Sequence, residues 1–347
     1  MIFFKLGSLK LSTIKSTIAK LFAILFIFQF IASCANKIHS EYISLYEYQI
    51  VDSAKKKDIS KIDIVKDLQT TDVIFIGEFH SHQASHKLQL DLIQMLYQQN
   101  PSLVISMEQF SRDAQPTLDG YLAGKYGEET LIEDANAWDN YKGSYRPIME
   151  FAKENHIPVI AANAPAMFVR CMGRRGSDFL ASIPEEKKSW SARKIDLTNK
   201  KYQEKFFSFL ESSGTSHGQS KKEASKRQIK TYSAQLLRDT TMAESILSAL
   251  DKYPNHQVIH LNGAFHSDNH LGTVAVIETE RPSIAIKVIS PVSSNSLEIK
   301  SIELNEYQQG EYLYLIKELP PRFLDDDKEM KSISKLIRSR LKEKCEL

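Results

Sequence analysis

The stretch Val73-Ile74-Phe75-Ile76-Gly77-Glu78-Phe79-His80 decides how the rest of the chain is organised. A short apolar, β-branched run that ends in glycine, carboxylate and imidazole is typical of a buried strand delivering polar groups at its carboxyl end. Three later segments repeat this design, and they are 103–106, 158–161 and 257–261. In an open parallel sheet the carboxyl ends of the strands share one edge, where ligands bind. We therefore expect one crevice to collect the polar residues that follow these strands, namely Glu78, His80, Glu108, Asn163 and His266.

Segments with helical spacing of apolar residues alternate with these strands. The predicted helices cover 84–98, 147–155, 165–180 and 232–250, and two further strands are expected at 273–278 and 283–289. A stretch from about 184 to 231 is polar and basic, and 211–230 has almost no apolar content, so we interpret it as an inserted helical cap with an exposed loop. The fold class predicted is α/β, with a mostly parallel central sheet, flanking helices and this cap.

The amino terminus predicts export to the cell envelope. Four lysines precede an apolar run at 21–31 that is too short for a comfortable membrane span, and the run closes on Ile31-Ala32-Ser33-Cys34. This ending resembles the lipobox of bacterial lipoproteins, so we expect residues 1–33 to be a signal peptide and Cys34 to be lipidated, with palmitate among its acyl chains. Ala35 in place of aspartate favours the outer membrane. The alternative is an anchor helix that is never cut.

Composition is that of an ordinary globular protein, with 42% hydrophobic and 25% charged residues in 347. Loss of four leader lysines turns the formal net charge from +2 to negative, so no affinity for nucleic acid is expected. Residues 34–60 are interpreted as a tether. Residues 321–347 form a predicted amphipathic helix whose apolar stripe packs on its own domain or, alternatively, on a partner. The stripe consists of Met330, Ile333, Leu336, Ile337 and Leu341.

Two cysteines, Cys171 and Cys345, remain after the leader. They could pair in an oxidising compartment, but their spacing does not indicate that they are close. We treat them as unpaired structural residues.

The first strand end carries the strongest chemical signal. Glu78 and His80 are two residues apart in extended backbone, so their side chains point the same way, and a carboxylate there can orient an imidazole or join it in binding a metal. Adding His82 and His86 gives a His-x-His-x3-His spacing that could bind a metal. The alternative is a set of exposed histidines at the start of a surface helix.

Two other residues extend this crevice. His266 ends a Gly-x-x-His turn like that of Gly77 to His80, although each turn could serve only the local backbone. Glu108 follows an apolar strand and needs a partner, for which the candidates are Arg170, Arg174, Arg238 and Asp239. Arg238 and Asp239 could instead form a structural ion pair. No serine elbow, Walker loop or dinucleotide fingerprint occurs.

Six sequence blocks together resemble the ChaN-like haem-binding lipoproteins, which are related to the Tiki proteases and the erythromycin esterases. They are 77–80, 107–110, 138–147, 162–170, 234–243 and 263–266, in the order and approximate spacing of that family. The resemblance covers about 72–272, and with its surroundings it assigns 61–320 to a ChaN-like α/β haem-binding domain.

The resemblance implies a lipid-anchored protein of iron acquisition that binds haem, with two chains bringing two haems face to face and an outer-membrane haem or iron uptake receptor as a further partner. Tyrosine is the implied axial ligand type, because phenolate favours ferric iron. Tyr145 is then the first choice and Tyr141 the second, although both could be packing aromatics. The other residues assigned to the cofactor are Trp138, Asn163, Arg170 and Arg238.

Two rival functions remain open. The first is a hydrolase of esters, lactones or peptides that uses Glu78, His80, Glu108 and His266, with His80 and His266 as alternative metal ligands. The second is an envelope interaction protein that presents its carboxyl-terminal helix.

Overall fold

The computed structural model describes residues 44–212 and 221–346. The predicted signal peptide, Cys34 and the first part of the predicted tether lie outside these residues, as does 213–220 of the predicted cap. Within the part described, no helix combines the length and the apolar character needed to cross a bilayer.

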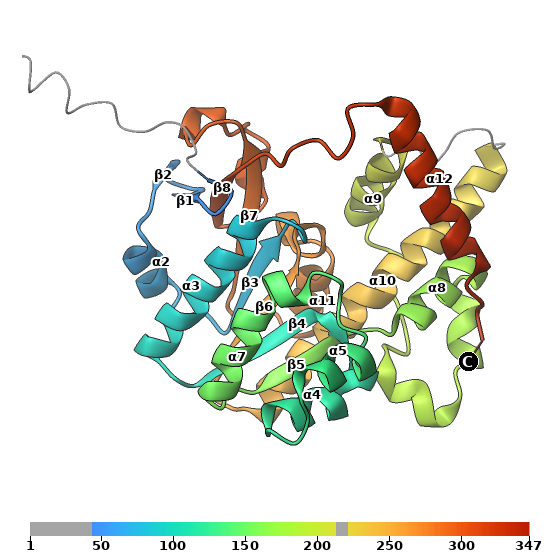
Figure 1. The fold of residues 1–347 in the computed structure, drawn as a ribbon, viewed down its shortest axis with the longest axis horizontal. Helices are drawn as coiled ribbons and strands as arrows, with labels where there is room; N and C mark the ends of the chain where they lie inside the picture. Colours follow the sequence, from blue (N-terminus) through green and yellow to red (C-terminus); the bar gives the residue numbers. More distant parts are fainter. Residues whose placement is uncertain (1–43, 213–220, 347) are drawn as a thin grey trace, which may run out of the picture. The chain divides into compact units, whose positions relative to one another are not determined.

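An eight-stranded sheet forms the centre, in the order β2-β1-β8-β7-β3-β6-β4-β5 (Figure 1). The pairs from β8 through β5 are parallel, whereas β1 is antiparallel to both β2 and β8. The strands are β1 (Tyr48–Asp52), β2 (Lys57–Asp58), β3 (Val73–Glu78), β4 (Leu103–Ser111), β5 (Val159–Asn163), β6 (Gln257–Gly263), β7 (Ile286–Ser294) and β8 (Tyr312–Lys317). The predicted mostly parallel α/β sheet is confirmed.

Strand β3 lies between β6 and β7, and all six of its residues are buried. Alternation along the strand sends Ile74 and Ile76 into a core shared with α3 and α7, while Val73 and Phe75 enter a second core shared with α10 and α11. Helices therefore cover both faces of the sheet (Figure 1). This double burial explains why the strand reads as a continuous apolar run in the sequence.

The helices follow the predicted order, with small shifts at the ends of α3 and α7, whereas α10 begins at Lys221 and not at 232. They are α2 (Lys61–Asp67), α3 (Gln83–Gln99), α4 (Gln115–Leu122), α5 (Glu128–Asp134), α6 (Tyr141–Ser144), α7 (Arg146–Glu154), α8 (Ala166–Arg175), α9 (Lys200–Ser212), α10 (Lys221–Lys252), α11 (Thr273–Glu280) and α12 (Asp326–Lys342). Helix α8 ends earlier than predicted, because Gly176 adopts a φ of +80° there.

The predicted strand at 273–278 was wrong, because these residues lie in α11. Its β-branched side chains favour a strand locally, but Val274 and Ile277 are three residues apart and both are buried against α10 and the sheet. Tertiary packing thus selected the helical spacing.

The region predicted as a cap contains α9 and the first part of α10. Tyr202 and Phe206 of α9 pack with Tyr232 and Leu236 of α10 and with Leu271. The described part of this region is therefore packed onto the main body through aromatic side chains.

The expectation that the apolar stripe of α12 packs on its own domain was wrong for three of its members, and the alternative of packing on a partner stays a prediction. Met330, Ile333 and Leu336 are 61%, 41% and 47% exposed. The side chains of Ile337 and Leu341 lie outside the description.

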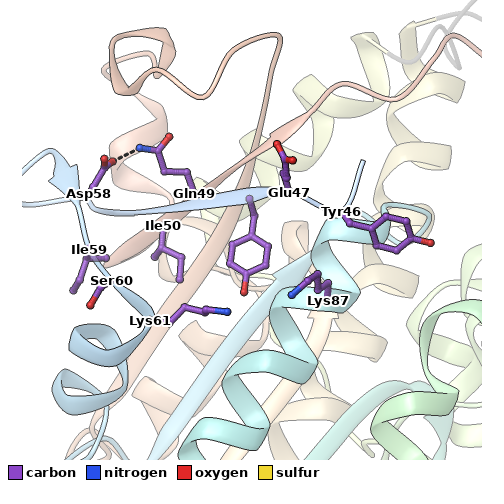
Figure 2. Close-up of a pocket in the computed structure, with 10 residues that line it drawn as sticks. Tyr46, Glu47, Gln49, Ile50, Asp58, Ile59, Ser60, Lys61 and Lys87 are labelled. Carbon is purple, nitrogen blue, oxygen red and sulfur yellow. Dashed lines mark hydrogen bonds between the residues drawn. The ribbon is translucent and has the colours of Figure 1, made fainter. Parts of the chain in front are cut away.

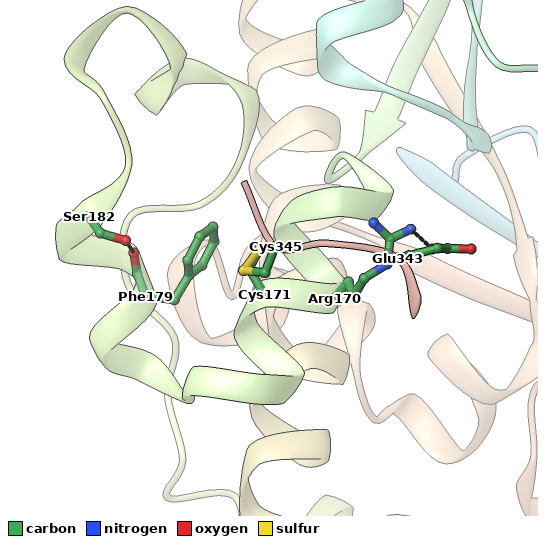
Figure 3. Close-up of a disulfide and its surroundings, with 6 residues drawn as sticks. All are labelled: Arg170, Cys171, Phe179, Ser182, Glu343 and Cys345. Atoms are coloured by element: carbon green, nitrogen blue, oxygen red, sulfur yellow. Dashed lines mark hydrogen bonds and ion pairs between the residues drawn. A yellow bond between two sulfur atoms is a disulfide. The ribbon is translucent and has the colours of Figure 1, made fainter. Parts of the chain in front are cut away.

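The chain after α12 returns to α8, where Cys345 forms a disulfide with Cys171 (Figure 3). The two Cα atoms are 5.3 Å apart although 174 positions separate them in the sequence. The interpretation of two unpaired cysteines was therefore wrong. A pairing over this separation leaves no local signal, because only the tertiary fold brings the two segments together.

A hydroxyl of β8 fixes the end of β3. The Tyr314 hydroxyl donates to the Gly77 carbonyl at 2.6 Å and lies 3.0 Å from the Ser85 hydroxyl. We expect Tyr314→Phe to lower the free energy of unfolding by about 1–2 kcal/mol, because the buried carbonyl loses its donor. Tyr312→Phe is the control, since its hydroxyl makes a longer, part-buried contact of 3.3 Å with Asp67. Equal losses in urea denaturation would contradict this role for Tyr314.

Candidate functional site

Polar side chains meet at the carboxyl ends of β3, β4, β5 and β6, as the strand pattern predicts. Glu78 is the last residue of β3, Glu108 lies in β4, Asn163 ends β5, and His266 lies in the 3₁₀ turn Ala264–His266 after β6. The Asn163 amide donates to the Glu108 carbonyl at 3.0 Å and so ties two of these strand ends together.

Glu78 is a buried carboxylate that accepts from four side chains. His80 Nδ1 and the Tyr145 hydroxyl lie 2.8 and 2.5 Å from Oε1. The amides of Gln89 and Gln109 donate at 2.6 and 3.2 Å. Burial alone would raise the pKa of Glu78, but the bond from His80 and the nearby imidazole charges outweigh it and hold the pKa below its ordinary value.

His80 is the accessible member of this group, with 46% of its side chain exposed. Its ring packs edge-on against Trp138, with centroids 4.8 Å apart. Burial of part of the ring lowers its pKa, but the bond to Glu78 and the charge of Glu108 raise it further, so the pKa lies above its ordinary value. His80 therefore keeps its proton to a higher pH than a free imidazole does.

A second carboxylate and imidazole face this pair. Glu108 Oε2 accepts from the Gly263 amide at 2.6 Å, and Oε1 lies 3.4 Å from His266 Nε2. His266 Nδ1 is 2.6 Å from Asp239 Oδ1. Burial opposes charge on His266, but Glu108 and Asp239 raise its pKa to about 10. At neutral pH the site thus holds a buried imidazolium between two acidic side chains.

The positive charge of Arg238 also affects the pKa of Glu108. Although burial raises the pKa of Glu108, the positive charges of His266, His80 and Arg238 lower it far below its ordinary value. Of the candidate partners predicted for Glu108, Arg238 therefore acts on it directly. Asp239 acts through His266, because it holds the other nitrogen of that ring.

The spacing of His80, His82 and His86 left open a metal site or a set of exposed histidines, and the second interpretation was wrong for His82 and His86, because both are buried. His82 is the N-cap of α3, where Nδ1 accepts from the Ala84 amide and Nε2 contacts the Lys317 carbonyl at 2.6 Å. His86 Nε2 bonds to the His80 carbonyl. His80 and His86 share the Glu78 carboxylate, with His86 Nδ1 3.6 Å from Glu78 Oε2, whereas His82 has other partners. Within the described residues, no group of three or more His, Cys, Asp or Glu side chains forms a possible metal cluster.

Tyr145 and Tyr141, the predicted axial ligands, are buried side chains. Tyr145 has no exposed surface and donates to Glu78, while Tyr141 is 2% exposed. Burial first, and the carboxylate of Glu78 second, raise the pKa of Tyr145 far above its ordinary value, so it is a neutral phenol. In this structure Tyr145 positions Glu78 and offers no accessible oxygen to a ligand.

A pocket of about 470 Å³ adjoins this cluster and contains four of the residues assigned to the cofactor. They are Trp138, Asn163, Arg170 and Arg238, which line it together with Glu108 and others. The sequence reasoning missed Trp190, which comes from the predicted cap, and Gln109, which directly follows Glu108. Trp190 carries no motif, whereas the position of Gln109 next to a strand-end carboxylate was a usable signal.

A second pocket, of about 510 Å³, is formed by β1 and the start of α2 with Lys87 of α3 (Figure 2). Its lining includes Tyr46, Tyr48 and Lys61 but no histidine. The strand-end pocket is therefore the stronger candidate, because it combines aromatic surface with a cluster of ionisable groups.

Gly263 leaves room for His80, since a Cβ at this position would lie 2.7 Å from His80 Nε2. We expect Gly263→Ala to displace the His80 ring from Glu78 and to lower the His80 pKa towards its ordinary value. Histidine NMR titration measures this shift. Gly127→Ala is the control, because a Cβ there has no neighbour within 4 Å. An unchanged His80 titration would contradict the close packing.

The raised pKa of His266 makes folding stability depend on pH. Because the pKa moves from 6.5 to about 10, the contribution is complete below about pH 6.5 and is lost as the pH rises towards 10. We expect wild type to lose stability between pH 7 and 9 by about 1 kcal/mol per pH unit more than His266→Gln, measured by urea denaturation. Equal slopes would mean that His266 is not charged in the folded protein.

Comparison with known proteins agrees with this architecture. A family model described as "Haem-binding uptake, Tiki superfamily, ChaN" matches residues 64–277. A solved structure titled "Cofacial heme binding to ChaN of Campylobacter jejuni" has a TM-score of 0.59 and 18% identity, covering 78% of this chain and 97% of that one. At 18% identity, this similarity shows only that the two proteins share a fold. No curated protein sequence matched.

Two further structures are more distant. An erythromycin esterase mutant in its open conformation has a TM-score of 0.42 and 13% identity, covering 72% of this chain and 78% of that one. A Bacillus cereus protein has a TM-score of 0.43 and 11% identity, covering 80% and 94%. Similarity at this level supports no argument about function.

Proposed function

The chain belongs to the ChaN family of haem-binding uptake proteins in the Tiki superfamily, and we propose that it binds haem in the strand-end pocket as a step in haem or iron acquisition. The observation that carries this proposal is the pocket's lining, in which Trp138 and Trp190 lie together with Arg170 and Arg238 beside the Glu108 carboxylate. When bound, haem would supply an iron centre to be stored or passed on.

The residues that line the pocket match the flat faces and the carboxylates of haem. Haem has two flat apolar faces and two carboxylates at one edge. Indole rings offer apolar surface to a flat face, and guanidinium groups bind carboxylates with paired hydrogen bonds. The volume of about 470 Å³ is within the range of pockets that hold small ligands and cofactors.

The resemblance to the family implied that a tyrosine binds the haem iron, and the structure does not favour this. Tyr145 is buried and bonded to Glu78, whereas His80 is 46% exposed and packs against Trp138 of the pocket. Its Nδ1 contact with Glu78 resembles the carboxylate–histidine arrangement that orients metal-binding imidazoles. We therefore propose that His80, in its neutral form, would be the donor to the haem iron, with Tyr145 holding Glu78 in place.

The charge state of the site limits the roles that His266 can play. His266 has a pKa of about 10, so at neutral pH it can donate a proton but cannot act as a general base. Glu108 is ionised and held by the Gly263 amide and His266. These groups form a fixed set of charges beside the pocket.

Titration with ferric haem, read by absorption spectrum and molar mass, tests the proposal. Saturable binding is expected, together with a doubling of mass if two chains bring their haems together. We expect His80→Ala to abolish a histidine-type spectrum and Tyr145→Phe to retain it. His256→Ala, which changes a partly exposed histidine, is the control. The reverse pattern would assign the iron to Tyr145, and no saturable binding would refute the function.

The proposed subcellular location of the protein rests on its sequence. The lysine-rich leader and the lipobox-like ending at Cys34 support our proposal of a lipid-anchored envelope protein, with the outer membrane favoured and an uptake receptor as partner. We expect palmitate labelling of the cells to mark the wild-type chain and to be lost in Cys34→Ser. Labelling that survives this change would contradict lipidation at Cys34.

A hydrolase is the second candidate, because two carboxylate–imidazole pairs face each other at one sheet edge. The pairs are Glu78 with His80 and Glu108 with His266. In this case Glu108→Ala and His80→Ala would abolish cleavage in an ester and peptide screen, whereas Tyr145→Phe would reduce it only through Glu78.

A further inference from the structure

The carboxyl terminus of the chain is fastened beside the strand-end pocket. Arg170 of α8 lines that pocket, and the next residue, Cys171, forms the disulfide with Cys345 (Figure 3). Two residues before Cys345, the Glu343 carboxylate pairs with the Arg170 guanidinium (Figure 3). One covalent bond and one ion pair thus connect the same two short segments.

The ion pair uses a group that the proposed ligand needs. A guanidinium that holds the Glu343 carboxylate has fewer N–H groups to offer to a carboxylate on a ligand. Because the disulfide keeps Glu343 near Arg170, the competition is intramolecular and has a high effective concentration. The pair is partly exposed, with 29% of the Arg170 side chain and 46% of the Glu343 side chain accessible, so a ligand can displace it.

The remainder of the carboxyl-terminal segment is weakly held. Residues 318–322 are exposed, and Met330, Ile333 and Leu336 of α12 keep much of their surface accessible. The disulfide and the Arg170 ion pair therefore connect the end of this segment to α8, which contributes Arg170 to the pocket. Opening the disulfide would let the end of the segment move away from Arg170.

We propose that residues 343–345 form a disulfide-held clasp, in which Glu343 occupies Arg170 and weakens the binding of carboxylate-bearing ligands until a dithiol opens the Cys171–Cys345 bond. This proposal rests on the proposed haem function, because it concerns the regulation of that pocket. It assigns the carboxyl terminus a role that the family resemblance, which ends near 272, does not address.

The opening step is a thiol–disulfide exchange. The attack falls on Cys345, which is partly exposed, whereas Cys171 is buried. A thiolate of the dithiol bonds to the Cys345 sulfur, and Cys171 leaves as a thiolate that takes up a proton. The second thiol of the reductant then closes its own disulfide and releases Cys345. The dithiol loses two electrons and two protons, and the protein gains both.

Ferric haem titration of the full chain carrying Cys34→Ser tests the clasp, because Cys171 and Cys345 are then its only cysteines. We expect Glu343→Gln to tighten binding by about two- to fivefold, as suits loss of a partly exposed ion pair. Cys345→Ser and dithiothreitol treatment should tighten it similarly. Glu346→Gln is the matched control, since it removes the same charge nearby but contacts Lys344. A haem analogue with ethyl groups in place of the propionates should bind all forms equally.

The outcomes separate the two proposals. If no form binds ferric haem, the proposed function fails. If all forms bind it with equal affinity, haem binding stands and the clasp is overturned. If Glu343→Gln tightens binding of the ethyl analogue as well, the effect is not competition for Arg170 and the clasp is also overturned. Ellman titration verifies that the dithiol has opened the disulfide in the folded protein.

Discussion

The buried carboxylate of Glu78 is the constraint on which the rest of the site depends. A carboxylate at the end of a fully buried strand is costly unless donors surround it. Here β3 delivers the carboxylate, α3 supplies Gln89, β4 supplies Gln109, and Tyr145 closes the arrangement. The remaining donor, His80, faces outwards and is the group that a ligand can meet.

The second carboxylate, Glu108 of β4, is also buried and is also surrounded by donors. Its partners are the Gly263 amide and His266, and His266 is held in turn by Asp239 of α10. Tyr202 of α9 donates to Asp239 at 2.8 Å, so the region predicted as a cap contributes to the hydrogen-bond network of the site. These hydrogen-bonded ionisable side chains lie beside a pocket that is lined by aromatic and cationic side chains. Such a pocket suits an anionic, flat ligand.

The molecule also shows how one chain can place competing groups at a single pocket. Helix α8 presents Arg170 to the pocket and Cys171 to the carboxyl terminus from adjacent positions. Any interaction that holds residues 343–345 in place therefore also affects the position of the Arg170 side chain, which lines the pocket. The same contact joins residue 343 to α8, a helix that begins shortly after β5 and contributes Arg170 to the pocket.

The sequence by itself determined the four strands β3, β4, β5 and β6, because each contains an apolar run that is buried in the sheet, and it determined which polar residues stand at their carboxyl ends. It did not determine β2, whose two residues, Lys57 and Asp58, are polar and exposed. The adjacency of Glu78 with His80 could be predicted because extended backbone fixes the side on which alternate residues lie. Only the tertiary structure decided that Val274 and Ile277 lie in a helix, that Cys171 meets Cys345, and that Tyr145 is buried against Glu78. The physical reason is the same in each case: periodicity and local geometry act over a few residues, whereas these outcomes depend on contacts between segments far apart in the chain.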